Sequence, residues 1–127
     1  MSVPVKVVVV DDTDHVREML TSMLSLDGFN VVAQARSGED ALKKVKDSKP
    51  DVVVMDYSMP DMDGLEATRQ IRAAIPKQSV ILYTAYVDDA LKKAASEAGA
   101  ALVVGKVEGL ETLERSISEL CLQLSGE

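Results

Sequence analysis

Five short runs of apolar, mostly β-branched residues alternate along this chain with segments that have helical periodicity. The runs are largely apolar along their whole length rather than at every second residue, which is typical of strands covered on both faces. They are Val5–Val10, Asn30–Ala35, Asp51–Asp56, Val80–Ala85 and Ala101–Lys106. Strands that alternate with helices in this way predict an α/β fold with a parallel sheet.

The segments between the runs carry apolar residues three and four positions apart, as amphipathic helices do. The first segment has such a stripe at Val16, Met19, Leu20, Met23 and Leu24. We expect Ser37 to cap the second helix, and Pro76 to stop a third helix over about Leu65–Ile75. The fourth and fifth helices are expected over Leu91–Ala98 and Leu110–Leu124. Right-handed crossovers between five strands and five helices then give a doubly wound (βα)5 sandwich.

Length and charge narrow the class of protein. With 127 residues the chain has the length of one domain, expected over residues 1–127 with its core at about 5–122. Its 14 basic and 21 acidic side chains give a net charge of −7, which argues against a nucleic-acid-binding surface. The single cysteine, Cys121, cannot form an internal disulfide, and no segment suits a signal peptide or a membrane span. We therefore expect a cytoplasmic protein that binds neither nucleic acid nor membrane directly.

Three acids, a hydroxyl and an amine stand at the carboxyl ends of the predicted strands. They are Asp11, Asp12, Asp56, Thr84 and Lys106. In doubly wound sheets these strand ends share one edge, and ligands bind there. Any one of these residues alone is more often a solvated turn or capping residue. Because they come from separate crossovers and have matching chemistry, together they predict a site.

These residue types suit phosphoryl transfer at a divalent cation. Three carboxylates with a loop carbonyl make an oxygen-rich site of the kind that binds Mg²⁺. Asp56 would be the central carboxylate, able to attack phosphorus and form an aspartyl phosphate. The Lys106 ammonium and the Thr84 hydroxyl would then bind phosphoryl oxygens. The chain has no Walker loop and no G-x-G-x-x-G, so its sequence gives no support for nucleotide binding.

Four stretches resemble, in order and spacing, the receiver domains of bacterial two-component response regulators. They are VVVVDD (Val7–Asp12), DVVVMDYSMPDMDG (Asp51–Gly64), ILYTA (Ile81–Ala85) and GK (Gly105–Lys106). The resemblance extends from about Val5 to Leu122 and implies a flavodoxin-like fold with strand order 2-1-3-4-5. It also implies a signalling domain rather than an enzyme, one that catalyses only its own phosphorylation and slow dephosphorylation.

The resemblance gives a role to each acidic residue of the site. Asp56 would accept a phosphoryl group from the phosphohistidine of a sensor histidine kinase or a histidine phosphotransfer protein. Mg²⁺ would be bound directly by Asp12 and Asp56 and by the backbone carbonyl of Ser58. Asp11 would act on the ion largely through water.

The resemblance also implies an output. Thr84 would move to meet the phosphoryl group, Lys106 would pair with it, and the face of the fourth helix, fifth strand and fifth helix would shift. That face would then bind a downstream protein or a second copy of the chain, and Leu124 is a candidate for exposure to a partner. Residues 31–72 look most like receivers joined to helix-turn-helix domains, so a receiver cut from a longer DNA-binding regulator is the runner-up. The chain itself has no basic recognition helix.

Two positions depart from the family pattern. Val107 stands where receivers usually have Pro, so we expect the Lys106–Val107 bond to be trans. Val103 stands where a Tyr or Phe usually rotates inward on activation, and it has no ring to move. Tyr86 either substitutes for that aromatic or is a loop residue without a switching role. Ser58 and Tyr86 also match positions that tune hydrolysis, and the Tyr86 ring could shield the acyl phosphate from water.

Two alternatives use the same residues. DTDHV (Asp12–Val16) fits the D-x-D-x-[TV] pattern of haloacid-dehalogenase-type phosphatases, with Asp12 as nucleophile and Asp14 as general acid. That family needs a later acidic pair for Mg²⁺, and no strand remains after Lys106 to carry it. The second alternative is an interaction module on the same fold that is never phosphorylated.

Overall fold

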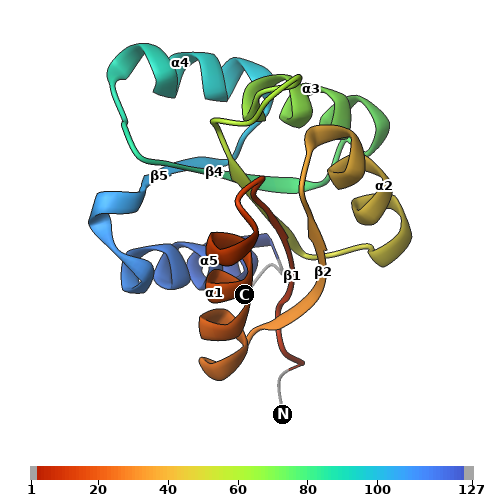
Figure 1. Cartoon of the computed structure of the whole chain (residues 1–127), viewed down its shortest axis with the longest axis vertical. Helices are drawn as coiled ribbons and strands as arrows, with labels where there is room; N and C mark the ends of the chain where they lie inside the picture. Colours follow the sequence, from red (N-terminus) through yellow and green to blue (C-terminus); the bar gives the residue numbers. More distant parts are fainter. Residues whose placement is uncertain (1–2, 125–127) are drawn as a thin grey trace.

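The computed structural model describes the backbone of residues 3–124 and the side chains of residues 3–122. Strands and α-helices alternate along the chain (Figure 1). The strands are β1 (Lys6–Val10), β2 (Asn30–Ala35), β3 (Val52–Asp56), β4 (Ser79–Thr84) and β5 (Leu102–Gly105). The helices are α1 (Asp14–Leu26), α2 (Gly38–Ser48), α3 (Gly64–Ala74), α4 (Asp89–Ala98), the 3-10 helix η1 (Lys106–Glu108) and α5 (Leu110–Leu124). Each predicted strand therefore differs from the observed one by at most one residue at either end.

All five strands lie parallel in one sheet. Their order is β2-β1-β3-β4-β5, which confirms the doubly wound, flavodoxin-like fold. The register pairs Val10 with Met55, Asp56 with Tyr83, and Thr84 with Gly105. The strands thus end at nearly the same level, and the residues that follow them meet at one edge of the sheet.

Helices cover both faces of the sheet (Figure 1). Val8 and Val10 of β1 belong to a core cluster with residues of α2, α3 and α4. Val7 and Val9 belong to a second cluster with residues of α1 and α5. Because successive side chains of a strand point to opposite faces, a strand covered on both sides must be apolar at every position.

Capping side chains fix where three of the helices begin. The Ser37 Oγ accepts the N–H of Asp40 at 3.1 Å, which confirms the predicted cap of α2. Asp63 and Asp88 cap α3 and α4 in the same way, through bonds from the third residue after each cap. At its other end, α3 stops at Ala74, two residues before Pro76.

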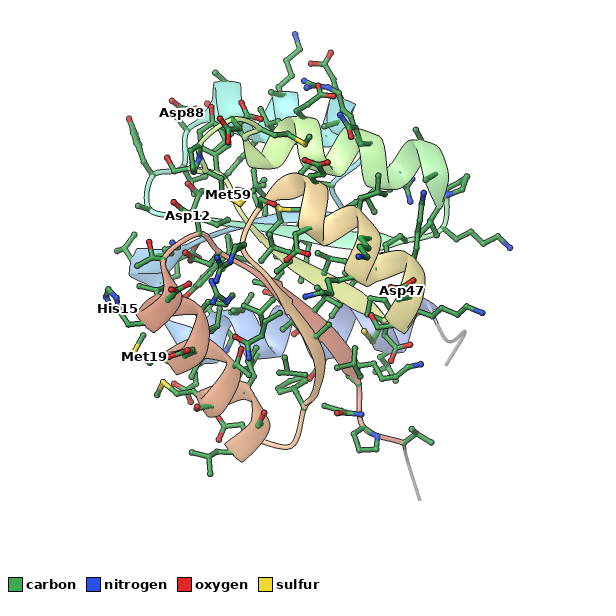
Figure 2. The ribbon with its side chains drawn as sticks, turned by 45° about the vertical axis from the view of Figure 1, so that its right-hand side comes forward. Asp12, His15, Met19, Asp47, Met59 and Asp88 are labelled. Carbon is green, nitrogen blue, oxygen red and sulfur yellow. The ribbon has the colours of Figure 1, made fainter. Side chains whose placement is uncertain are left out.

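The apolar stripe predicted for α1 is wrong at two positions. Leu20 and Leu24 are buried, but Met19 and Met23 are 57% and 43% exposed, while Arg17 is buried. Figure 2 shows Met19 projecting away from the sheet. Periodicity places residues on one side of a helix but does not give the width of the strip that its neighbours cover.

The chain turns sharply after β5. The peptide bonds of the described residues are all trans, which confirms the expectation for Lys106–Val107. Val107 is exposed in η1, and Gly109 takes a φ of 90° before α5 begins. Val103 is partly buried against the cluster under α2, α3 and α4. The side chain of Leu124 lies outside the described residues.

No helix in the described part of the chain combines the length and the apolar character that crossing a membrane requires.

Candidate functional site

The residues expected at the strand ends lie together. A cavity of about 740 Å³ opens at the carboxyl edge of the sheet. The residues selected from the sequence that line it are Asp11, Asp12, Asp56, Ser58, Thr84, Tyr86 and Lys106. Figure 2 shows Asp12 at this end of the molecule with Met59 and Asp88, while Asp47 lies at the far end of α2. Val103 is the one predicted site residue that does not line the cavity.

Three carboxylates form an acidic cluster in this cavity. Asp11, Asp12 and Asp56 each offer an oxygen, and these oxygens all lie within 4.8 Å of one another. Asp11 and Asp56 are 4% and 7% exposed, whereas Asp12 is exposed. The closeness follows from the topology, because β1 and β3 are neighbours in the sheet and end side by side.

The cluster has the donors that a hard divalent cation prefers. Carboxylate oxygens that converge on an opening with one exposed member can bind Mg²⁺ while the ion keeps several water ligands. Like charges this close repel each other when they are partly buried, and a bound cation would relieve that repulsion. The residues present therefore fit Mg²⁺. Ser58, whose backbone carbonyl is the further ligand expected from the sequence, lines the same cavity.

Lys106 supplies the positive charge that the chain itself brings to the cluster. Its Nζ lies 3.4 Å from Asp56 Oδ1 and 3.7 Å from Asp11 Oδ2, and 5.8 Å from the centre of the Tyr83 ring. Burial raises the pKa of Asp56 above its ordinary value, and the nearby Asp11 adds to this rise. The Lys106 ammonium and a backbone hydrogen bond from Ser58 lower that pKa in part. Asp56 is thus a partly desolvated carboxylate beside a partly exposed cation.

The loop after Asp56 is tied closely to the strand. The Gly64 N–H donates to the Tyr57 carbonyl at 2.9 Å. A Cβ on Gly64 would collide with the Asp56 carbonyl oxygen and crowd Leu82, so only glycine allows this approach. The glycine at this point of the sequence therefore fixes the path of residues 57–63 over the site.

Thr84 and Tyr86 occupy the other side of the cavity. Thr84 ends β4 and is buried, with its side chain in the lining. Tyr86 also lines the cavity but is 65% exposed, so most of its ring is in solvent. The geometry places both residues where the sequence predicted them, while a role for Tyr86 in tuning stays a prediction.

Asp14 is placed poorly for the role that the phosphatase alternative gives it. Its carboxylate accepts a hydrogen bond from Arg17 at 2.8 Å, and it does not line the cavity. That hydrogen bond and the charge of Arg17, with help from Arg36, lower the pKa of Asp14. A general acid near neutral pH needs a raised pKa, and the surroundings of Asp14 act in the opposite direction.

The sequence reasoning missed two polar residues that shape the site. Arg17 donates to the Asp11 carbonyl at 2.9 Å, and the Glu108 carboxylate accepts the Gly105 N–H at 2.8 Å, just before Lys106. Arg17 could have been noticed, because it stands three and seven residues before Leu20 and Leu24, on the apolar side of α1. No sequence pattern we considered pointed to Glu108.

The fold and the cavity define a flavodoxin-like domain with an acidic, cation-competent pocket at the strand ends. A family model described as the response regulator receiver domain matches residues 7–118, most of the chain. The chain belongs to this family, and the resemblance seen in its motifs is confirmed. The haloacid-dehalogenase alternative is thereby set aside.

Curated relatives support the same family. The chain is 45% identical over 114 residues to the response regulator GacA of Pseudomonas syringae pv. syringae, covering 89% of this chain and 53% of that protein. It is 42% identical over 97 residues to the chemotaxis protein CheY of Listeria monocytogenes, covering 72% of this chain and 82% of that protein. The chain thus spans about half the length of the GacA relatives that it matches.

Solved structures agree on the fold. The signal receiver domain of the putative response regulator NarL from Mycobacterium tuberculosis is 32% identical, with a TM-score of 0.87 over 94% of this chain and 98% of that one. The CheX–CheY–BeF3–Mg²⁺ complex from Borrelia burgdorferi contains a chain that is 30% identical, with a TM-score of 0.83 over 93% of this chain and 90% of that one.

Proposed function

We propose that this chain is a phosphorylation-dependent signalling domain of a two-component system. Asp56 accepts a phosphoryl group, in a Mg²⁺-dependent reaction, from the phosphohistidine of a sensor histidine kinase or a histidine phosphotransfer protein. One observation carries this proposal: three carboxylate oxygens within 4.8 Å of one another, with the Lys106 Nζ 3.4 Å from Asp56. Membership of the receiver family supports it.

The proposed transfer is a substitution at phosphorus. An Asp56 carboxylate oxygen forms a bond to phosphorus while the bond from phosphorus to the donor imidazole nitrogen breaks. The electron pair of that bond stays on the imidazole nitrogen, and the product is an aspartyl phosphate. Mg²⁺ bound by Asp12, Asp56 and the Ser58 carbonyl, with Asp11 acting through water, would neutralise charge on the phosphoryl oxygens.

Lys106 and Thr84 complete the binding of the phosphoryl group in this proposal. The Lys106 Nζ is 3.4 Å from Asp56, longer than the charge-assisted hydrogen bonds that hold a lysine firmly. Lys106 can therefore change its partner from Asp56 to a phosphoryl oxygen at little cost. The Thr84 hydroxyl donates to another of these oxygens.

The proposed signalling output involves the helices that follow Thr84 and Lys106. Thr84 leads into α4 and Lys106 begins η1, which leads into α5. Movement of both toward the phosphoryl group would bias the face of α4, β5 and α5 toward a second conformation, as a population shift. A downstream protein or a second copy of the chain binds that conformation. Because Val103 has no ring, the shift has to pass through the loops themselves.

The chain would do this in the cytoplasm, alone or as the receiver part of a longer regulator. The second possibility is supported by the GacA relatives, which are about twice the length matched here. The receiver itself does not contact nucleic acid.

Labelling by a small phosphodonor tests the proposal. Acetyl phosphate should label the wild-type chain only when Mg²⁺ is present, and Asp56→Asn should reduce labelling to background. Asp47→Asn, at an exposed carboxylate of α2 far from the cavity, is the matched control and should leave labelling unchanged. Absence of label in the wild type would favour an unphosphorylated interaction module, and label mapped to Asp12 would contradict Asp56 as the acceptor.

A further inference from the structure

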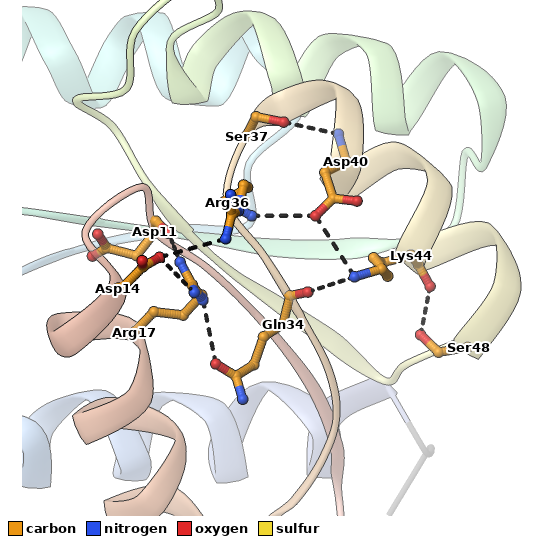
Figure 3. A network of polar contacts seen from close by, with 9 residues as sticks. All are labelled: Asp11, Asp14, Arg17, Gln34, Arg36, Ser37, Asp40, Lys44 and Ser48. Carbon is orange, nitrogen blue, oxygen red and sulfur yellow. Dashed lines mark hydrogen bonds and ion pairs between the residues drawn. The ribbon is translucent and has the colours of Figure 1, made fainter.

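Arg17 of α1 is a buried charged residue beside the acidic cluster. Its side chain is 9% exposed, on the side of the helix that carries Leu20 and Leu24. Three of its nitrogens donate hydrogen bonds to three different residues (Figure 3). Nη1 donates to the Asp11 carbonyl at 2.9 Å, Nε to Gln34 Oε1 at 3.3 Å, and Nη2 to Asp14 Oδ1 at 2.8 Å. The rigid fork of a guanidinium allows this combination, and a lysine could not make it.

The bond from Arg17 completes the fixation of Asp11. The Asp11 N–H donates to the Ala35 carbonyl at 3.1 Å, and Asp11 Oδ1 accepts the Thr13 N–H at 2.9 Å. With its carbonyl held by Arg17, both backbone polar groups and one carboxylate oxygen of Asp11 are engaged. The other oxygen, Oδ2, is the one that lies 3.7 Å from Lys106 Nζ. Asp11 therefore presents a single oxygen toward the cluster in a defined direction.

The same contacts continue into a closed ring of polar contacts between α1, β2 and α2, two of them through backbone atoms (Figure 3). Asp14 lies 3.9 Å from the Arg36 guanidinium, and the Arg36 N–H donates to Asp40 at 3.3 Å. Lys44 Nζ contacts Asp40 at 3.6 Å and the Gln34 carbonyl at 2.9 Å. The ring connects the loop that carries Asp11 and Asp12 to β2 and α2.

We propose that Arg17 is a positioning residue for cation binding. It fixes the loop after β1 so that Asp11 and Asp12 face Asp56 before the cation arrives. Binding then needs little rearrangement of the loop. The inference rests on the proposed function only in taking Mg²⁺ as the cation.

The test is a Mg²⁺ titration of folded protein, followed by the amide NMR shifts of Thr13 and Ser58. Arg17→Gln should weaken Mg²⁺ binding by roughly 10- to 100-fold, the usual effect of losing a residue that orients metal ligands. Arg36→Gln is the matched control, because it removes the same charge and also touches Asp14, yet does not contact Asp11. It should change the Kd by less than about twofold, as expected for a screened surface charge.

A purely structural role for Arg17 would lower thermal stability but leave the Kd of the folded molecules unchanged, and that result would overturn the inference. If Arg17→Gln does not fold, Arg17→Lys keeps the charge and the aliphatic stem. A wild-type Kd in Arg17→Lys would also overturn the inference. Failure of the proposed function would look different, because the wild type itself would then show no Mg²⁺-dependent shift of these amides.

Discussion

The two halves of the site differ in how firmly the protein holds them. The metal half comprises residues 11–13 and 56–64, and the response half comprises residues 84–88 and 106–109. In the metal half, Asp11 and Asp56 are almost fully buried, and hydrogen bonds from Arg17 and Gly64 fix the loops that carry them. In the response half, Lys106 is 31% exposed and Tyr86 and Val107 are largely in solvent.

This difference matches what each half would have to do. A cation site works best when its ligands are already in place, because the binding energy is then not used to order them. A segment that transmits a signal must have a second conformation within a few kcal/mol of the first. The structure thus places two buried, hydrogen-bonded carboxylates on one side of the cavity and the more exposed Lys106 and Tyr86 on the other, and we expect the second side to rearrange more easily. Four experiments can test this difference between the metal half and the response half.

Lys106→Gln should show how far the two halves depend on each other. Without Mg²⁺, Asp11 and Asp56 would lose their cationic neighbour, and the free energy of unfolding should fall by about 1–2 kcal/mol, less than for a fully buried pair. With Mg²⁺ the loss should be smaller, because the ion neutralises the same carboxylates. Urea unfolding with and without Mg²⁺ measures both values.

Lys93→Gln is the control for this variant, since Lys93 is an exposed lysine of α4 without an ion pair among the described residues. An equal loss for Lys106→Gln in the presence and absence of Mg²⁺ would contradict the view that both cations act on one cluster.

The pH dependence of the free energy of unfolding should report the burial of the Asp56 carboxylate. Burial raises the pKa of Asp56 above 3.8, so the folded protein binds this proton more tightly than the unfolded chain does. Metal-free stability should therefore rise as the pH falls through the folded pKa, and level off below 3.8. Bound Mg²⁺ should reduce this rise in the free energy of unfolding, because the ion favours the charged form of Asp56.

Glu114 of α5 should also make the free energy of unfolding rise as the pH falls. Burial and the neighbouring Asp27 raise its pKa to about 7. The unfolding experiment is therefore best done in Glu114→Gln, with Glu114→Gln/Asp56→Asn as the comparison. An identical pH slope in these two proteins would show that Asp56 does not titrate as the structure indicates.

Glu108→Ala tests how firmly the response half is held. The Glu108 carboxylate accepts the Gly105 N–H at 2.8 Å and so holds the turn that begins with Lys106. Its removal should lower the free energy of unfolding by about 0.5–1 kcal/mol, as for the loss of a partly exposed capping bond. Chemical denaturation measures this, with Glu111→Ala, an exposed glutamate in the first turn of α5, as the control. A loss no larger than in the control would mean that the turn is held by its backbone alone.

Tyr86→Ala is expected to have the smallest effect. If the ring shields the acyl phosphate, its removal should speed decay of the phosphorylated protein, but only by about two- to threefold because the ring is mostly in solvent. The measurement is the loss of label from phosphorylated wild type and variant after donor removal. Equal or slower decay in Tyr86→Ala would leave the ring without a protective role.

Most of the fold could be predicted from the sequence. The apolar runs gave each strand to within one residue, and the caps and stops at Ser37 and Pro76 acted as expected. The prediction failed at Met19, which is exposed, and did not include Arg17, which is buried, because packing rather than periodicity decides both. The aliphatic stem of an arginine can lie in a partly apolar environment while its head finds acceptors, and a hydropathy pattern does not reveal this.

The sequence by itself determined which groups would stand at the carboxyl edge of the sheet, because parallel strands bring their ends to one edge whatever their exact packing. Only the tertiary structure decided how those groups face one another. It set the carboxylate oxygens within 4.8 Å, buried Asp11 but left Asp12 exposed, and brought Arg17 to the Asp11 carbonyl. The carboxylate distances depend on the pairing of β1 with β3, which lie far apart in the chain, and the Arg17 bond depends on how α1 packs against the sheet. No local sequence pattern records either kind of contact.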